Sequence, residues 1–492
     1  MNRPFALSSL IFLVLVFLIL IFFHTRGFIP YDEGWFLQAG KRLLDGEKIY
    51  KDFEFLYNPG GAYLNALAFS LFGESILASR LLALANSVLT VFILLFISKK
   101  LKLSGFLSAV LVLIYVFWGP GHINFVWPVM LCITAALGTG VLFLLGEKSK
   151  NKPRVVFFIG IISALTFVFK QIFGVAIFVT NLLLFLIAKD YRNAKLIFWY
   201  FVGYGSIATL QALYFLHNQT LLIYIKEIYH FTVVKIYQQG ILNSDLPWNY
   251  PAPILTKVFK FFFYFSPILI SIVSLKVLFA RKKTKMLIYF PLITIAYYVF
   301  SISPTTDYVH IAPLLALSSL PLVIIYQGNK KTWSKTGIGI ILILVCLLGI
   351  YSSLFRNYYR WNAPLISQSL FSDNHKMLLW TDTKENKNVS EITNYFDKNS
   401  KNEQYIFVYN FAPAYYLLLD KKNPTRYDYL HTGVMDTGKQ NEIVDVLQKM
   451  KLKHILVNID ISKEPTIVSK YIRDNYNIAK EVNEYSIWKR IK

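Results

Sequence analysis

The first 355 residues alternate between long apolar runs and short polar connections. Several of the runs approach the roughly 20 residues that an α-helix needs to cross the hydrocarbon core of a bilayer. The pattern therefore predicts a polytopic α-helical membrane protein with about eleven membrane-spanning helices. The expected spans lie at about 5–23, 76–97, 104–118, 125–145, 155–170, 172–188, 195–216, 258–280, 286–301, 308–326 and 337–355.

Lysine and arginine gather in every second connection between these runs, at 99–102, 148–154, 189–195, 281–285 and 330–335. Cytoplasmic loops of membrane proteins retain Lys and Arg, so this distribution indicates orientation. We expect a multi-pass protein of the cell membrane (plasma or inner membrane) with a cytoplasmic N-terminus. No small-residue cleavage site follows the first run, so we expect an uncleaved first helix. An odd number of spans then places the C-terminal residues outside.

The first outward-facing connection, at 24–75, carries two shorter helical patterns. Residues 34–44 mix apolar and polar side chains at helical spacing, which predicts an amphipathic helix on the membrane surface. Residues 60–72 are apolar but too few to cross a bilayer, so we expect a second helix that is interfacial or re-entrant. A turn sequence at 57–61 separates the two juxtamembrane helices.

From about residue 356 the apolar runs shorten to strand length and polar residues become frequent. Alternating strand and helix patterns predict a small extracytoplasmic α/β domain over 356–492, after a membrane domain over 1–355 that includes the first outer loop. This stretch has no glycine-rich phosphate loop, so we do not expect nucleotide binding there. The expected strands are 405–409, 454–459, 478–482 and 485–489, and the expected helices are 389–399, 440–450 and 466–476.

Composition supports membrane embedding, because 55% of the residues are hydrophobic whereas soluble domains contain about 45–50% apolar residues. The formal net charge is +23. Most of this excess lies in short loops beside the spans, and no nucleic-acid-binding motif is evident, so we expect no nucleic-acid partner. Cys132 and Cys346 lie within apolar runs as small packing residues. Two cysteines cannot form a metal cage or a disulfide framework by themselves.

The first candidate for chemistry is the adjacent pair Asp32 and Glu33 in the first outer loop. A carboxylate there could accept a proton from a sugar hydroxyl or bind a divalent metal ion; the alternative is a solvated loop acid. Lys170 stands alone between two apolar runs on the outer side, where Lys is otherwise rare. It could neutralise a lipid phosphate or anchor the helix end by snorkelling. Arg80, which opens the second span, has the same two interpretations.

A second set of polar residues lies at the outer end of the tenth span. The spacing of Asp307, Tyr308 and His310 could support a metal ion, a proton relay or substrate hydrogen bonds; a capped helix start with a surface histidine is the structural alternative. Glu33 and His310 are the candidate ligands if a divalent ion takes part, although the sequence does not demand a cofactor. The connection at 217–257 is either a substrate loop or a structural one.

Four short motifs follow one another in the first 100 residues, at 30–35 (Pro-Tyr-Asp-Glu-Gly-Trp), 57–59 (Tyr-Asn-Pro), 71–73 (Leu-Phe-Gly) and 80–81 (Arg-Leu). Together with a surface helix after the acidic pair, they resemble the polytopic GT-C glycosyltransferases. The resemblance is strongest to the protein O-mannosyltransferase and lipid A aminoarabinose transferase group, and it extends to the architecture of the whole chain. This sequence has Pro59-Gly60-Gly61 where that group usually has Pro-Pro-Leu.

The resemblance implies a GT-C-like fold, a polyprenyl-phosphate-linked sugar as donor and a place for Asp32 at the acceptor. We therefore expect an integral membrane glycosyltransferase that moves a hexosyl or pentosyl group to a hydroxyl of a glycan, protein or lipid acceptor on the outer face. Nucleotide sugars are absent from that side, so the donor must arrive on a lipid. Asp32 would be the base of a single inverting displacement, with Glu33 positioning it, and Lys170 and Arg80 would bind the donor phosphate.

The remaining candidates complete the predicted site. Tyr57, Asn58, Asp307, Tyr308 and His310 are expected substrate contacts. The alternative function is that of a polytopic lipid or solute transporter or flippase. Such proteins usually carry charged groups near mid-membrane and repeated halves. Here the middles of the spans are nearly free of charged residues, and no two halves of the sequence match.

Overall fold

The structure is a computed structural model that describes residues 3–229, 254–280, 285–301, 308–329, 331–355, 363–430 and 435–491. Contacts divide the chain into two compact units. The helical unit comprises Met1–His24, Leu56–Gly60 and Ala83–Phe355, and the mixed unit comprises Thr25–Phe55, Gly61–Leu82 and Arg356–Lys492. Two helices, α3 (Gly60–Phe72) and α4 (Ile76–Lys100), contribute residues to both units.

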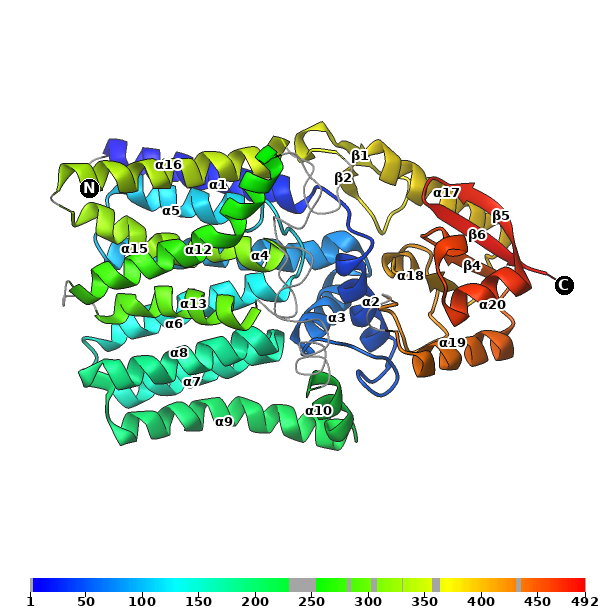
Figure 1. Cartoon of the computed structure of the whole chain (residues 1–492), viewed down its shortest axis with the longest axis horizontal. Coiled ribbons are helices and arrows are strands. Elements are labelled where there is room, and N and C mark those ends of the chain that lie inside the picture. Colours follow the sequence, from blue (N-terminus) through cyan, green and yellow to red (C-terminus); the bar gives the residue numbers. More distant parts are fainter. Residues whose placement is uncertain are drawn as a thin grey trace. The chain divides into compact units, whose positions relative to one another are not determined.

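Long helices dominate the helical unit (Figure 1). Besides α4, the α-helices of this unit, long and short, are α1 (Arg3–His24), α5 (Gly105–Trp118), α6 (Pro128–Gly146), α7 (Lys152–Phe169), α8 (Gln171–Ile187), α9 (Ala194–His217), α10 (Leu221–Tyr229), α12 (Ile254–Ala280), α13 (Tyr289–Ser301), α14 (Tyr308–Ile311), α15 (Leu315–Gln327) and α16 (Thr332–Phe355). Every predicted span coincides with helix, and the tenth divides into α14, a 3-10 turn around Pro313 and α15.

Length and composition distinguish two groups among these helices. Within the described residues, α4, α6, α7, α9 and α16 are long and apolar enough to cross a membrane. The other predicted spans are shorter apolar helices in the described part of the chain. The long connection predicted at 217–257 includes α10, and its residues 230–253 lie outside the described residues.

Small residues let neighbouring helices of this unit approach closely. The helices α7 and α9 lie side by side (Figure 1), and a side chain at Gly160 or Gly203 would collide with the backbone of the other helix. Asn181 of α8 donates a hydrogen bond to Ser163 of α7 at 2.8 Å. Close backbone approach and buried hydrogen bonds are the usual means of helix association in membranes. These contacts fix α7 and α8, which are joined at Lys170.

The mixed unit combines most of the loop predicted at 24–75 with the C-terminal residues. Its sheet has the strand order β3-β4-β6-β5, with β3 and β4 parallel and the other pairs antiparallel, while β1 and β2 form a separate antiparallel pair. Its elements are α2 (Asp32–Leu44), most of α3, β1 (Ser369–Phe371), β2 (Leu379–Thr381), α17 (Thr383–Asn399), β3 (Phe407–Tyr409), α18 (Ala414–Leu418), α19 (Thr437–Met450), β4 (His454–Val457), α20 (Ile467–Asn475), β5 (Tyr476–Val482) and β6 (Tyr485–Arg490).

The strands and helices predicted after residue 356 are present within a few residues of their expected positions. Alternate residues of the central strands face opposite sides. Leu456 and Ile487 pack in one cluster with Val389 of α17, whereas Ile455 packs in another with Ile443 of α19. Helices therefore cover both faces of the sheet. The strands β1 and β2 and the helix α18 were not predicted, because elements of three to five residues give no periodic pattern.

The first outer loop shares a hydrophobic core with the C-terminal residues. Phe28, Leu37 of α2 and Phe69 of α3 belong to the same buried cluster as Val389 and Leu456. The sequence pattern assigned this loop to the membrane domain, whereas the contacts group its residues 25–55 and 61–75 with residues 356–492. The segment that carries the acidic pair is thus fixed by apolar packing against residues more than 300 positions later in the chain.

The prediction that α2 is an amphipathic surface helix is wrong in one respect, because the helix is buried on nearly every side. Its polar residues are enclosed together with acidic partners: Arg42 bonds Asp428 at 2.9 Å, and Lys41 bonds Glu74 at 3.1 Å. Gly34 is also packed against Ala414, with no room for a side chain. Ion pairs to distant residues bury a polar helix face, and local hydrophobic periodicity does not reveal them.

Candidate active site

The acidic pair opens the helix α2 rather than lying in a loop. Asp32 is half-buried in the first turn, and Glu33 is 1% exposed. The preceding Pro30 accepts a hydrogen bond from the backbone N–H of Ala414 (3.2 Å), which ties the helix start to α18. A helix N-terminus carries a partial positive charge and stabilises carboxylates in its first turn. The fold therefore presents Asp32 on a fixed helix end.

Glu33 is held by Arg80 in a fully buried ion pair. Its two carboxylate oxygens accept hydrogen bonds from Nε and Nη2 of Arg80 at 2.6 and 2.7 Å. Arg80 also donates to the carbonyls of Arg26 and Gly27, each at 2.6 Å. Forked arginine–carboxylate pairs of this kind combine strength with fixed geometry. The structure thus shows partners for both residues within the chain, and the contacts predicted for Arg80 with the donor phosphate and for Glu33 with a metal ion stay predictions.

The loop before α2 is fixed by the short strand β2. Gly27 donates to the carbonyl of Trp380 (2.8 Å), and Trp380 donates to that of Thr25 (2.9 Å). The guanidinium of Arg26 lies 4.4 Å from the centre of the Trp380 ring. Gly27 has a φ of +69°, a conformation that glycine adopts without strain. These contacts hold the carbonyls of Arg26 and Gly27 where Arg80 can bind them.

Lys170 lies in the helical unit at the junction of α7 and α8. It is 2% exposed, and its backbone is fixed by bonds to Thr166 (3.0 Å) and Gly174 (2.9 Å). Its Nζ lies 5.4 Å from the ring centre of Tyr57 and 6.0 Å from that of Tyr297. Aromatic faces attract an ammonium group at these distances. Lys170 is therefore a buried cation that aromatic rings help to hold.

The lysine cluster consists of Lys170, Tyr57, Tyr297, Trp127 and His310. The ring of Trp127 lies 6.1 Å from that of Tyr57 and 5.6 Å from that of His310. His310 is buried on α14, not a surface histidine. The sequence did not single out Trp127 and Tyr297, because aromatic residues make up 17% of the chain and these two carry no distinguishing motif.

Asn58 adjoins this cluster and is wholly buried. Its amide nitrogen donates to the carbonyl of Phe167, and its amide oxygen accepts from the Tyr224 hydroxyl at 3.0 Å. The next turn is closely packed, because a side chain at Gly60 would collide with the Phe169 ring. This packing gives a physical reason for glycine at position 60, where the resembled enzymes have proline. Asn58 is thus bonded to α7 and α10, beside the rings around Lys170.

The predicted metal ligands Glu33 and His310 belong to different units, and their role stays a prediction. No group of three or more His, Cys, Asp or Glu side chains there is placed to hold a metal ion. Asp307 lies outside the described residues, and so does the side chain of Tyr308. The predicted association of Asp307 and Tyr308 with His310 stays a prediction.

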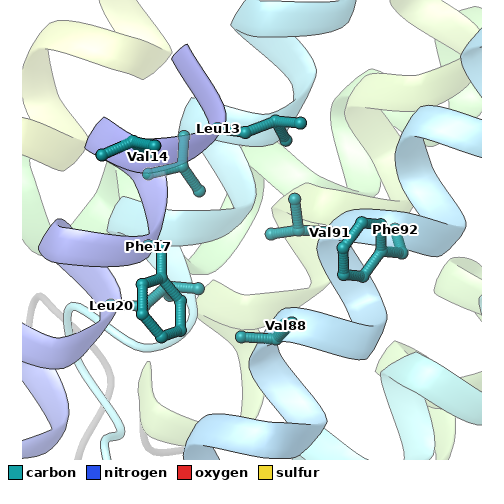
Figure 2. A pocket seen from close by; sticks show the side chains of 8 residues that line it. Leu13, Val14, Phe17, Leu20, Val88, Val91 and Phe92 are labelled. Carbon is teal, nitrogen blue, oxygen red and sulfur yellow. The ribbon is translucent and has the colours of Figure 1, made fainter. Parts of the chain in front are cut away.

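An apolar groove of about 350 Å³ runs between α1 and α4. Figure 2 shows Phe17 and Leu20 of α1 on one side and Val88 and Val91 of α4 on the other. Every lining residue is Leu, Val or Phe. A second groove of about 410 Å³ shares Leu13 with the first and continues along α1 toward α5. Both grooves thus have mainly apolar linings and lie along α1.

The mixed unit also contains a buried carboxyl group, that of Glu385 in α17. Burial, reinforced by the Glu484 and Asp382 carboxylates, raises the pKa of Glu385 to about 7. Lys384, next to it in α17, binds Glu484 at 2.8 Å. The neighbouring Tyr415 belongs to α18, the helix that fixes the start of α2.

No family model and no curated protein sequence matches the chain. Solved structures do match. ArnT from Cupriavidus metallidurans bound to undecaprenyl phosphate superposes with a TM-score of 0.61 at 12% identity, over 98% of each chain. Its apo form gives 0.59 at 12% identity, over 99% of this chain and 98% of that one. An Archaeoglobus fulgidus oligosaccharyltransferase in complex with Zn and sulfate gives 0.50 at 12% identity, over 92% and 68%.

These structures share the GT-C fold, so the predicted resemblance is confirmed at the level of the fold. The likeness to ArnT extends over nearly the whole chain and includes both the helices and the C-terminal residues. The expected architecture, a polytopic helical membrane protein with a C-terminal α/β part, is thereby confirmed as well. The likeness concerns the fold, and activity has to be argued from the residues.

Proposed function

We propose that this chain is an integral membrane glycosyltransferase that takes a sugar from a polyprenyl-phosphate carrier and attaches it to an acceptor hydroxyl on the outer face of the membrane. The observation that carries the proposal is a buried lysine among aromatic rings in a fold that, in ArnT, has been solved with undecaprenyl phosphate bound. A half-buried aspartate at a fixed helix start supplies the second chemical group. A membrane-embedded phosphate needs a cation, and an acceptor hydroxyl needs a base.

In the proposed reaction Asp32 is the general base. The acceptor oxygen forms a bond to the anomeric carbon of the sugar while its proton passes to the Asp32 carboxylate. The bond between the anomeric carbon and the phosphate oxygen breaks, and the polyprenyl phosphate leaves with the electron pair. A single displacement of this kind inverts the configuration at the anomeric carbon. Asp32 then releases its proton to water.

Lys170 is assigned to the phosphate of the donor and of the leaving group. Negative charge grows on that phosphate as the glycosidic bond breaks, and a preorganised cation stabilises it most at that point. Tyr57 and Tyr297 hold the ammonium group in place through their ring faces. Trp127 and His310, the other rings of the lysine cluster, are assigned to the donor sugar or its phosphate.

Glu33 and Arg80 are assigned a positioning role instead of a direct one. Their forked pair joins α2 to α4, and the remaining donors of Arg80 clamp the loop at Arg26 and Gly27. Glu33 follows Asp32 directly in the first turn of α2, so anchoring Glu33 restricts the position of Asp32. The pair is thus proposed to set the orientation of the base while taking no part in proton transfer.

The apolar grooves along α1 are assigned to the isoprenoid chain of the donor. They contain almost only hydrocarbon side chains, so they favour a hydrocarbon chain over a polar one. A carrier whose chain occupied this path would be anchored by apolar burial, and recognition of the sugar would be left to the polar residues. This assignment predicts that short-chain donors bind more weakly than long-chain donors.

The proposal is tested with the full chain reconstituted in lipid vesicles. Polyprenyl-phosphate sugars are supplied as donors, nucleotide sugars are supplied in parallel, and an envelope extract provides acceptors. Release of free polyprenyl phosphate and a glycosylated product, both followed by mass spectrometry, are the expected results for lipid-linked donors alone. Movement of the intact lipid-linked sugar across the vesicle membrane without any cleavage would overturn the proposal and would indicate a flippase.

A further inference from the structure

A groove of about 490 Å³ lies on the mixed unit among α19, α20 and the end of β6. This size is within the range of about 300–1,000 Å³ typical of small-molecule sites. The positions that α20 contributes are 467, 470, 471, 474 and 475, which lie on one helix face. Gln448 of α19 and Arg490 of β6 complete the lining. None of the residues assigned to sugar transfer takes part in it.

Arg490 is the most informative residue of this groove. Its backbone N–H donates to the carbonyl of Lys453 (2.9 Å), and it pairs with Tyr476 across the sheet, so its position is fixed. The guanidinium carbon lies 5.9 Å from the centre of the Tyr476 ring. Nη1 is buried and has no hydrogen-bond partner among the described residues. A buried guanidinium donor is costly unless something accepts its hydrogen bond, so a groove that holds one suits an anionic ligand.

Tyr471 provides a second buried polar atom in the lining. The residue is 8% exposed, and its hydroxyl is buried without a partner in the part of the chain that the structure describes. Its backbone carbonyl accepts a hydrogen bond from the Asn475 side chain at 2.9 Å, which stiffens the last turn of α20. Two polar atoms of the lining residues, Nη1 of Arg490 and the hydroxyl of Tyr471, thus have no hydrogen-bond partner within the described residues.

The remaining lining residues indicate the class of ligand. Ile467 is the one purely apolar side chain in the lining, so the groove is unsuited to an apolar peptide or an acyl chain. Amide and carboxylate groups, from Gln448, Asn475 and Asp474, can bond hydroxyls that both donate and accept. Two cations, Lys470 and Arg490, face a single acid. This combination suits a sugar ring that carries negative charge.

We propose that this groove binds an acidic saccharide, and that this saccharide is a part of the acceptor other than the hydroxyl that receives the sugar. Arg490 and Lys470 bind the acidic group, with the guanidinium offering a forked pair of donors. Tyr471 and Asn475 bond the ring hydroxyls. The role as acceptor rests on the proposed transferase function, whereas binding of the saccharide does not depend on it.

Binding is measured with the full chain in lipid nanodiscs and without any donor. The probes are cellobiuronic acid, which carries one carboxylate, and cellobiose, its neutral counterpart, each titrated by ligand-observed NMR. The acidic disaccharide is expected to bind at least tenfold more tightly. Tyr471→Phe, which removes one hydroxyl, is expected to weaken its binding by about two- to tenfold, and Arg490→Gln by about ten- to a hundredfold. Lys449→Gln is the matched control, an exposed residue of α19 outside the lining.

Equal affinity for the two disaccharides, or unchanged affinity in both Tyr471→Phe and Arg490→Gln, overturns the proposal. Displacement of the bound disaccharide by an acidic peptide or by anionic lipid vesicles at equal charge also overturns it, because the groove would then recognise charge alone. Failure of the transferase function has a separate signature: the disaccharide binds as expected, yet no polyprenyl phosphate is released. Conversely, if Arg490→Gln still transfers sugar with an unchanged KM for the acceptor, the transferase function stands and the groove is not an acceptor site.

Discussion

Two buried cations, one in each unit, are stabilised in different ways. In the mixed unit Arg80 is bonded to both oxygens of Glu33 and to two carbonyls, at 2.6 to 2.7 Å. In the helical unit Lys170 lies over the rings of Tyr57 and Tyr297, at 5.4 and 6.0 Å. A guanidinium in short contact with a carboxylate is a structural clamp, whereas aromatic faces hold an ammonium group more softly. The sequence suggested donor-phosphate binding for both residues, and the structure shows that their internal partners differ.

The largest effect is expected from breaking the clamp. Arg80→Met leaves the Glu33 carboxylate buried without its counter-charge, which costs about 3–5 kcal/mol. For a unit of this size the thermal unfolding midpoint should fall by about 10 °C, measured on the full chain by a thermal shift assay. The double variant Glu33→Leu/Arg80→Met should recover much of this loss, because apolar replacement of a whole buried pair is often nearly neutral. A midpoint unchanged in Arg80→Met would contradict the structural role.

Glu385 adds a third case, a buried charge that the fold neutralises by protonation. Because the folded state raises the pKa of Glu385 from 4.5 to about 7, its protonated form favours folding. That contribution is complete below pH 4.5 and is lost as the pH rises to about 7, at a cost of about 3 kcal/mol. The full chain should therefore unfold at lower temperature at pH 8 than at pH 5.

Substitution of Glu385 separates its contribution to the pH dependence of stability from the contributions of other titrating groups. Glu385→Gln removes the titrating proton, so the variant should lack this slope and exceed the parent in stability above pH 7. The exposed Glu481→Gln is the control and should keep the slope of the parent. Identical pH profiles for the parent and Glu385→Gln would show that Glu385 does not titrate in this range.

Lys170 should affect activity more than stability. Lys170→Met keeps the length of the side chain and removes the charge, so we expect transfer to slow by about ten- to a hundredfold, the value of a charged hydrogen bond. Lys152 offers a matched control, because its ammonium group lies 5.5 Å from the Tyr191 ring in the same unit. Lys152→Met should retain full activity with lipid-linked donors. Equal losses of transfer activity in Lys170→Met and Lys152→Met would mean that the loss comes from disturbed packing and not from removal of the phosphate-binding charge.

The smallest effect is expected at the apolar groove. Val91→Trp fills the space between α1 and α4, and we expect it to raise the KM for long-chain donors a few-fold while leaving short-chain donors unaffected. Val273→Trp, on an exposed part of α12, is the control for added bulk at the lipid face. A similar KM for both chain lengths in Val91→Trp would place the isoprenoid chain elsewhere.

The fold was largely predictable because its helices are long and apolar, and a periodic pattern over many residues is a strong signal. The burial of α2 was not predictable, because Arg42 is paired with Asp428, 386 positions away in the sequence. The same holds for the bonds of Arg80 to Glu33, because the two residues are 47 positions apart in the sequence. Trp127 and Tyr297 carry no motif at all, and their place beside Lys170 follows from tertiary packing alone.

The central claim, that Asp32 is the base of the transfer, is tested most directly by Asp32→Asn. The amide keeps the size of the side chain and cannot take the acceptor proton, so transfer from a polyprenyl-phosphate sugar should fall by about 10²- to 10⁴-fold. The thermal unfolding midpoint should stay within a degree or two of the parent, and Asp52→Asn, an exposed acid of the same loop, should keep full activity. Undiminished transfer by a folded Asp32→Asn variant would contradict the account.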